Sequence, residues 1–429
     1  MRYQQIDNAL FIRNRKEFYK HLAPNSLAVF NSNDIYPTSA DGTMPFKQHK
    51  DIFHLSGVDQ EESILVVFPD CQEKELREVL FVIETNEHIA TWEGEKLTKE
   101  KATEVSGIQN VVWTKDFEAT FAKMMSLAEN VYLNTNEHLR ANTEVETRED
   151  RFVKWCKEYY PVHTYKRAAP IMHQVRSIKH PIEINLMQNA CNITEKGFRR
   201  LLSFIKPGVW EHEIEAELWH EFIRNRSMGF AYTPIVASGG NACVLHYIEN
   251  DQECKDGDLI LMDFGAEYAN YSSDMTRTVP VSGRFSERQK QLYNAVLRVK
   301  NQANAILQPG ITLKDYHVEV GEMMTKELLD LKLLTSDEVK KQDPAWPAYK
   351  RFFMHGTSHY IGLDTHDVGS WSNPIEEDQV FTIEPGIYIK EEGIGIRLED
   401  DYVIKSGGNH NLMGNIPIEI EEIEDLMNS

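Results

Sequence analysis

The chain has 429 residues and a formal net charge of −21. It is longer than one hydrophobic core usually accommodates, so we expect two domains. It has no run rich in lysine and arginine, which excludes the electrostatic surface that nucleic-acid binding needs. No apolar run approaches the roughly 20 residues of a membrane span, and the N-terminus lacks the apolar segment of a signal peptide. The five scattered cysteines form no C-x-x-C pair. We therefore expect a cytoplasmic globular protein with reduced cysteines and no nucleic-acid or membrane partner.

The first third of the chain has the pattern of an α/β domain. Apolar runs at 26–30, 63–68 and 79–83 alternate there with polar stretches of helical character. A basic, proline-punctuated stretch follows at 161–183. We expect an N-terminal α/β domain over 1–175 and a catalytic domain over 176–429.

The second part contains an internal repeat. Helical patterns at 182–205 and 287–307 both end in a Pro-Gly pair, at Pro207 and Pro309. Each is followed by another helical pattern, a histidine motif and two acid-bearing strands. This order predicts a duplicated α+β unit, packed about a pseudo-two-fold axis that brings both acid pairs to a shared centre.

Four acidic residues lie in or beside these apolar strands. Asp263 is inside LILMDFGA, and Asp274 follows across a hairpin whose turn we place near 269–271. Glu384 ends QVFTIEPG, and Glu399 lies in the alternating GIGIRLEDDYVI. One such carboxylate is usually solvated or salt-bridged, but four that meet in a core need compensating cations. The pattern therefore predicts a dinuclear metal site.

A histidine cluster supplies a further ligand. His355, His359 and His366 all lie in MHGTSHYIGLDTHDVG. One imidazole with four carboxylates is an oxygen-rich set that favours Mn²⁺, although Mg²⁺, Co²⁺, Fe²⁺ or Zn²⁺ also fit. Metal-bridging hydroxide could then attack a scissile carbonyl, so the sequence predicts a hydrolase with two divalent ions.

These motifs resemble a known family. LMDFG…SSDMTRT, MHGTSH…DTHDVG, TIEPGIY and GIRLEDD are similar to the pita-bread metallopeptidases, and particularly to aminopeptidase P. The segments that begin at Asp41 (DGTMPFKQ) and Trp92 (WEG) resemble the creatinase-like N-terminal domain of that family.

The resemblance implies a role for each matching residue. Asp263, Asp274, His359, Glu384 and Glu399 are expected to bind two metal ions. Glu384 helps to deprotonate the bridging water, His246 and His366 steady the carbonyl or oxyanion, His355 lies beside the substrate, and Arg397 supports the metal ligands. Tyr232 and Tyr388 are expected near the substrate, although ordinary core tyrosines are nearly as plausible.

The same resemblance implies the substrate: peptides with proline at the second position. Their imide nitrogen has no N–H, so general peptidases miss this bond. Prolidase shares the fold and ligands and stays an alternative, as does, less favourably, a catalytically dead peptide-binding module. Asp41 and Trp92 suggest a homo-oligomer, a dimer or tetramer, in which they reach a neighbouring subunit's substrate.

Overall fold

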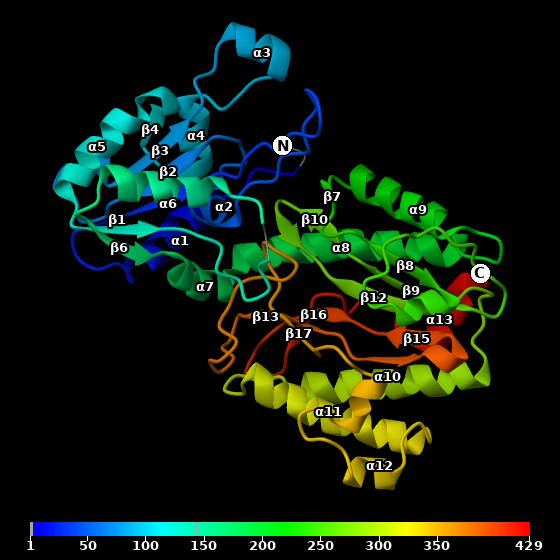
Figure 1. Ribbon diagram of the computed structural model, residues 1–429. Helices are drawn as coiled ribbons and strands as arrows, with labels where there is room; N and C mark the ends of the chain where they lie inside the picture. The colour runs from blue at the N-terminus through cyan, green and yellow to red at the C-terminus, as the bar shows by residue number, and fades with distance from the viewer. Residues whose placement is uncertain (1–2, 143) are drawn as a thin grey trace. The chain divides into compact units, whose positions relative to one another are not determined.

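A computed structural model describes residues 3–142 and 144–429. The chain forms two compact units (Figure 1). One is Gln5–Arg176, and the other is Ser177–Ser429, to which Tyr3 and Gln4 also belong.

The N-terminal unit is built on a six-stranded sheet of order β4-β3-β2-β1-β5-β6. The antiparallel pairs are β1–β2 and β2–β3, and the other neighbours are parallel. Its strands are β1 (Ser26–Asn31), β2 (Ile64–Val67), β3 (Glu78–Val82), β4 (Asn110–Trp113), β5 (Asn130–Leu133) and β6 (Thr164–Arg167). Its helices are α1 (Ala9–Tyr19), α2 (Lys50–Ser56), α3 (Glu87–Glu93), α4 (Lys99–Ser106), α5 (Phe117–Leu127), α6 (Arg148–Tyr159) and α7 (Ala169–Ser177), which ends in the other unit.

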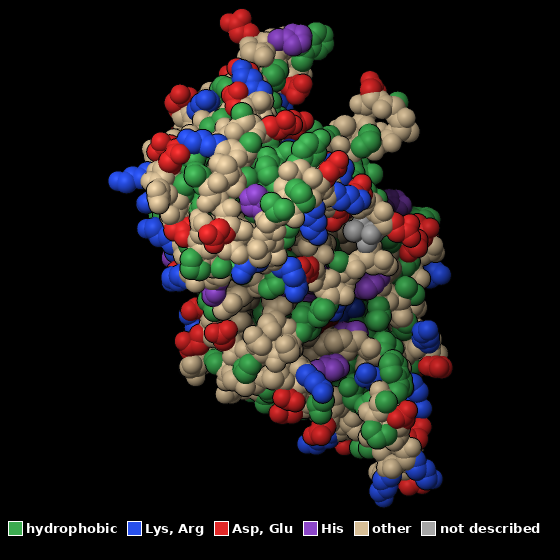
Figure 2. All heavy atoms as spheres, turned by 60° about the vertical axis from the view of Figure 1, so that its left-hand side comes forward, with side chains coloured by type: hydrophobic (Ala, Val, Ile, Leu, Met, Phe, Trp, Pro, Cys, Tyr) green, Lys and Arg blue, Asp and Glu red, His purple; other side chains and the backbone are tan. Residues whose placement is uncertain are grey.

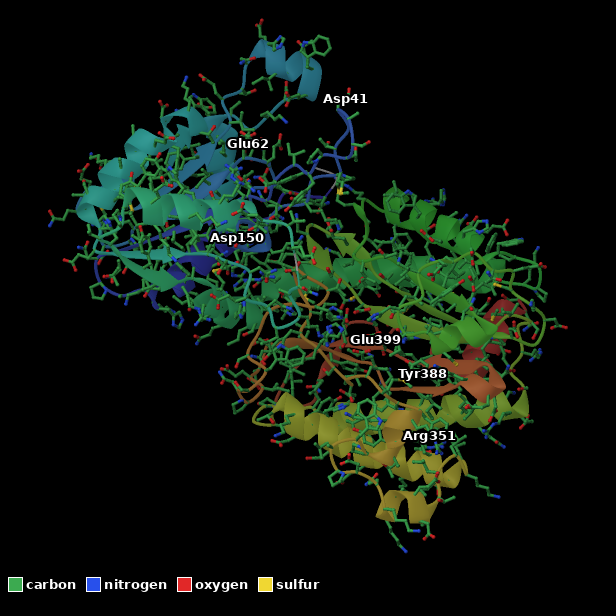
Figure 3. The ribbon with its side chains drawn as sticks, viewed as in Figure 1. Asp41, Glu62, Asp150, Arg351, Tyr388 and Glu399 are labelled. Carbon is green, nitrogen blue, oxygen red and sulfur yellow. The ribbon has the colours of Figure 1, made fainter. Side chains whose placement is uncertain are left out.

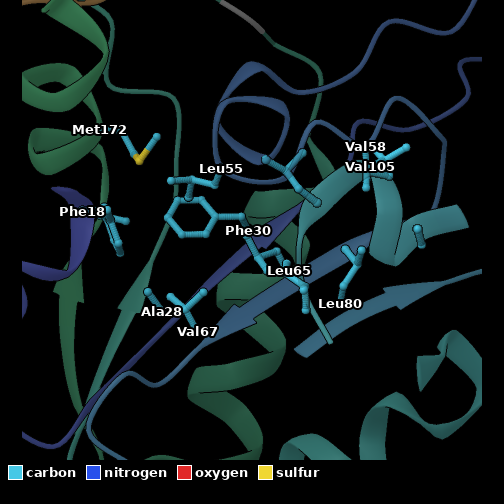
Figure 4. Packing of buried hydrophobic residues seen from close by; sticks show 14 of the residues in the cluster. Phe18, Ala28, Phe30, Leu55, Val58, Leu65, Val67, Leu80, Val105 and Met172 are labelled. Carbon is cyan, nitrogen blue, oxygen red and sulfur yellow. The ribbon is translucent and has the colours of Figure 1, made fainter. Parts of the chain in front are cut away.

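Both faces of this sheet are buried, which explains the continuous apolar runs. Successive side chains of a strand point to opposite faces. Ala28 and Phe30 of β1 therefore pack in one cluster with Leu55, while Leu27 and Val29 pack in the other, which includes residues of α5. Figure 4 shows the first cluster, with Phe30 against Leu55 and Leu65.

The second unit repeats one arrangement of helices and strands. The first half contains α8 (Pro181–Phe204), α9 (Glu211–Arg224), β7 (Gly229–Phe230), β8 (Ile235–Ser238), β9 (Leu259–Phe264), β10 (Ala266–Tyr268), β11 (Tyr271–Ser272) and β12 (Met275–Pro280). The second half contains α10 (Glu287–Ile306), α11 (Leu313–Asp330), α12 (Ser336–Lys340), β13 (Val380–Ile383), β14 (Gly386–Ile389), β15 (Ile394–Arg397), β16 (Asp400–Val403), β17 (His410–Asn411) and α13 (Ile420–Met427). Figure 1 shows α8 and α9 on one side of the strands and α10 and α11 on the other. The fold class expected from the sequence is confirmed.

Strand pairing places the acidic residues within this unit. β9 lies between β8 and β12, with Asp263 opposite Thr276. The hairpin from β10 to β11 turns at Ala269 and Asn270, whose φ angles are 54° and 70°. Positive φ at both central residues is typical of the two-residue turn that fits the strand twist. The turn expected near 269–271 is therefore present.

Acidic and basic side chains are interspersed over the face that Figure 2 shows. Across residues 3–142 and 144–429, no helix is both long and apolar enough to cross a membrane. All five cysteines are buried and free.

Candidate metal centre

The five expected ligands come from separate strands and loops of the second unit. Asp263 lies in β9, and Asp274 stands between β11 and β12. His359 lies in the loop that precedes β13, Glu384 follows β13 directly, and Glu399 stands between β15 and β16. Figure 3 shows Glu399 and Tyr388 among the strands of this unit. The fold thus brings together residues that are far apart in the sequence.

The ligand atoms converge. One ligand atom each of Asp274, His359 and Glu399 lie within 4.8 Å of one another. The Nε2 atom of His359 is 3.4 Å from Oδ2 of Asp274 and 3.8 Å from Oε1 of Glu384. Asp263 joins through the Tyr232 hydroxyl, which is 2.6 Å from Oδ1 of Asp263 and 2.5 Å from Oδ1 of Asp274.

The approach of the strands near Asp263 depends on a glycine. A Cβ atom at Gly265 would lie 1.7 Å from the carbonyl oxygen of Ser273, so no larger residue fits. This glycine therefore allows the segment after Asp263 to pass close to the segment before Asp274.

The centre carries more negative charge than its own cations balance. Burial, followed by the charges of Asp274 and Glu384, raises the pKa of Glu399 well above its usual value. Burial is also the largest cause for Glu384, whose pKa is raised to about 7 despite the opposing charge of His359. Burial raises the pKa of Asp263 too, although Arg397 opposes it. Such a carboxylate set fits added divalent cations.

His359 has the orientation that a metal ligand needs. Its Nδ1 atom is 2.9 Å from the carbonyl oxygen of Tyr360, to which it can donate, so Nε2 faces the carboxylates. A hydrogen bond of this kind at the far nitrogen is typical of metal-binding histidines. Burial lowers the pKa of His359, but the hydrogen bond to Asp274 and the charges of Glu384 and Asp274 raise it to about 9 overall. A positive charge at Nε2 is therefore favoured here.

Arg397 and Tyr388 support the carboxylates from β15 and β14. The Nη2 atom of Arg397 is 2.5 Å from Oδ2 of Asp263, and its Nη1 atom donates to the Tyr388 hydroxyl at 2.8 Å. The same hydroxyl is 2.8 Å from Nε2 of His355, whose Nδ1 atom is 3.5 Å from Oε2 of Glu384. Burial, followed by the charge of Arg397, lowers the pKa of His355 to about 3. His355 is therefore neutral beside Glu384.

The other two expected histidines are exposed at the protein surface. The ring of His366 stands edge-on to His359, with centroids 4.5 Å apart. His246 lies in the loop that follows the 3-10 helix Gly239–Cys243, and its charge contributes to the lowered pKa of His355. Both can therefore face a substrate.

Comparison with known proteins finds a family match in each of the two units. Residues 185–406 match metallopeptidase family M24, and residues 11–132 match the aminopeptidase P N-terminal domain. The Xaa-Pro aminopeptidase of Haemophilus influenzae is 34% identical over 97% of this chain and 97% of its own. That of Escherichia coli is 33% identical over 99% of this chain and 98% of its own.

This chain belongs to metallopeptidase family M24. Within the family it is of the aminopeptidase P type. The solved structure of zinc-substituted Escherichia coli aminopeptidase P with product matches it with a TM-score of 0.88 and 32% identity, covering 99% of both chains. The chain is therefore a metal-dependent aminopeptidase that uses divalent cations.

Two supporting residues of this M24 centre escaped the sequence analysis. The Thr276 hydroxyl donates to Oε2 of Glu399 at 2.7 Å and accepts from Nε of Arg397 at 3.0 Å. His317 of α11 lies 2.9 Å from the Thr357 hydroxyl, and the carbonyl of Thr357 accepts the N–H of Glu384. Thr276 is two residues beyond Asp274, and this period-2 spacing was the available signal. A lone histidine on a helix gave none.

Asp41 and Trp92 lie in the N-terminal unit rather than with the metal ligands. Asp41 is exposed near the end of a hairpin-like loop, in which the N–H of Thr38 donates to the carbonyl of Gly42 (Figure 3). Trp92 in α3 is 77% exposed, and the His88 ring lies 6.3 Å away. Both residues therefore belong to the unit that contains none of the five expected metal ligands.

Proposed function

We propose that the protein removes the N-terminal residue from peptides whose second residue is proline, with a pair of divalent metal ions held by Asp263, Asp274, His359, Glu384 and Glu399. The convergence of these residues carries the proposal of a dinuclear site. The Xaa-Pro aminopeptidases that match nearly the whole chain support the choice of substrate. The oxygen-rich donor set supports manganese as the metal.

Bound divalent ions supply Lewis acidity and lower the pKa of a coordinated water. The residues of the chain supply the rest of the reaction. Glu384 accepts a proton from the attacking water, since its carboxylate lies beside His359 among the proposed ligands. His246 and His366 donate hydrogen bonds to the carbonyl oxygen as negative charge develops there.

His355 and Arg397 orient this machinery. The neutral imidazole of His355 lies between Glu384 and the Tyr388 hydroxyl, next to the bound peptide. Arg397 balances part of the charge of Asp263 and holds Tyr388. Tyr232 spans Asp263 and Asp274 and limits how far these two carboxylates can move apart.

We further propose a homo-oligomer in which Asp41 and Trp92 contact the substrate bound to a neighbouring subunit. Support comes from their exposure and from their place in a domain without the metal ligands. The buried free cysteines suit the reducing cytoplasm, which is the location we propose.

Cleavage products test this function. We expect the Mn²⁺-loaded enzyme to release glycine from Gly-Pro-X tripeptides faster than from the Gly-Pro dipeptide, with products identified by mass. Gly-Ala-X peptides serve as the control for proline at the second position. Faster cleavage of the dipeptide would move the assignment to prolidase, and no cleavage of any substrate would contradict a peptidase.

A further inference from the structure

Glu211, the first residue of α9, is a carboxylate with no solvent exposure. Its Oε1 atom accepts hydrogen bonds from the backbone N–H and the hydroxyl of Ser238, both at 2.7 Å. Its Oε2 atom accepts from the Tyr247 hydroxyl at 2.7 Å and from the N–H of Gln252 at 3.0 Å. A buried carboxylate is stable only with such donors. All of these donors come from the stretch 238–252.

This stretch carries His246 at its centre. Ser238 stands at its beginning, where β8 ends, and Gln252 stands near its end. The side chains of Val244, His246 and Ile248 are exposed, whereas Tyr247 is buried. The buried Tyr247 therefore anchors the loop next to His246. Through its two carboxylate oxygens, Glu211 links Tyr247 to Ser238 and Gln252 at the two ends of the loop.

The anchor also contacts the surroundings of the metal centre. Tyr247 packs in an apolar cluster with Leu261 of β9 and with Tyr388, and Met354 packs against the same cluster. Tyr388 in turn binds His355 and Arg397 through its hydroxyl. Because Tyr247 is the next residue in the chain, its position also fixes the backbone of His246 relative to Tyr388, His355 and Arg397.

A second acid of α9 holds the same loop. One turn after Glu211, Oε2 of Glu215 accepts from the side-chain amide of Asn250 at 2.9 Å. Asn250 is buried with φ of 48°, a left-handed conformation that asparagine tolerates, and its Oδ1 atom accepts the N–H of Val236. The N-terminal half of α9 is therefore a fixed support for this loop.

We propose that Glu211 is a positioning residue that acts through Tyr247 to hold His246 at the scissile carbonyl. The proposal rests on the role proposed above for His246. Only a carboxylate fits, because both of its oxygens accept hydrogen bonds here. A glutamine would turn an NH₂ group toward Ser238 or toward Tyr247 and Gln252, where donors already point. The expected consequence is a displaced loop and a misplaced imidazole.

The test measures kcat and KM of Mn²⁺-loaded Glu211→Gln with a Gly-Pro-X tripeptide. We expect kcat to fall about 10- to 100-fold, since small misplacements of catalytic groups have effects of this order, while KM changes little. In a His246→Ala background the same substitution should have almost no further effect on kcat. Tyr247→Phe, which removes only the hydroxyl group and its hydrogen bond to Glu211, should show the same dependence on His246.

Glu213→Gln is the matched control. Glu213 lies on the same turn of α9 and accepts only the N–H of Trp210 at the helix end, so its loss weakens the helix without touching the loop. Its kcat should stay within about 2-fold of wild type, a change of about 0.4 kcal/mol. Bound metal should be equal in all of these variants.

Two results would overturn the proposal. One is an unchanged kcat in both Glu211→Gln and Tyr247→Phe, and the other is the same fold-loss with and without His246. If Glu211→Gln does not fold, Tyr247→Phe decides by the same two criteria. Failure of the wild-type enzyme to cleave the peptide would instead contradict the proposed function and is thus distinguishable.

Discussion

Lys179 and Asp367 form a buried ion pair whose disruption should strongly destabilise the catalytic unit. The Nζ atom of Lys179 is 3.0 Å from Oδ2 of Asp367, and the two side chains are 2% and 1% exposed. Lys179→Met keeps the length of the side chain and removes its charge, which leaves the carboxylate buried without this cation. Breaking such a pair costs about 3–5 kcal/mol. We expect a loss of unfolding free energy of that size.

The assay is urea denaturation of the metal-loaded protein, in which the transition of the catalytic unit is followed by loss of activity and by circular dichroism. Lys405→Met is the matched control, because Lys405 pairs with Asp378 in the same unit but these side chains are 44% and 36% exposed. An exposed pair contributes about 0–1 kcal/mol. Equal destabilisation by the two substitutions would refute the argument that burial sets the cost.

Two further predictions concern the metal centre, and a third concerns the arrangement of subunits. Thr276→Val should lower kcat about 10- to 100-fold with the fold intact, because Glu399 loses the hydroxyl that holds it; circular dichroism and steady-state kinetics check this. Metal loading at pH 6.5 should release at least one proton, since the pKa of His359 is about 9 without metal and burial raises the pKa of Glu384, to about 7, and of Glu399. Metal affinity should fall as the pH drops below about 9, where His359 gains a proton, and more steeply below about 7, where Glu384 gains one. Calorimetry in buffers of different ionisation enthalpy measures both effects. Asp41→Asn and Glu384→Ala, each impaired alone, should regain activity when refolded together, if Asp41 serves a neighbouring subunit; mixtures no more active than the mean of the two would contradict this.

The candidate metal ligands of the catalytic unit could be predicted from the sequence because they are acidic residues that lie in or beside recognisable apolar strands. Asp263 interrupts an apolar strand, where a buried carboxylate needs a positive charge nearby. Bound cations would balance the charge of four such carboxylates together. The turn at Ala269 and Asn270 was also visible in the sequence. For the same reason the α/β pattern of the N-terminal unit was clear, since both faces of its sheet are buried.

The supporting residues were missed because their local patterns give weak signals or none. Thr276 is a common strand residue, and its hydroxyl gains a role only because the fold brings it against Glu399 and Arg397. Glu211 looks like the usual acidic residue in the first turn of a helix. Its contacts with Ser238, Tyr247 and Gln252 depend on how the loop folds back, which local sequence does not encode.

The number of metal ions bound per chain tests the central claim most directly. Mass spectrometry of the purified, Mn²⁺-loaded protein should find two ions per chain in the wild type. Glu399→Ala should bind fewer ions and lose activity while keeping its fold, because Glu399 is one of the five proposed ligands. A chelator should abolish activity, and added Mn²⁺ should restore it. One ion or none per fully active chain, or full activity of Glu399→Ala without metal, would contradict a dinuclear centre.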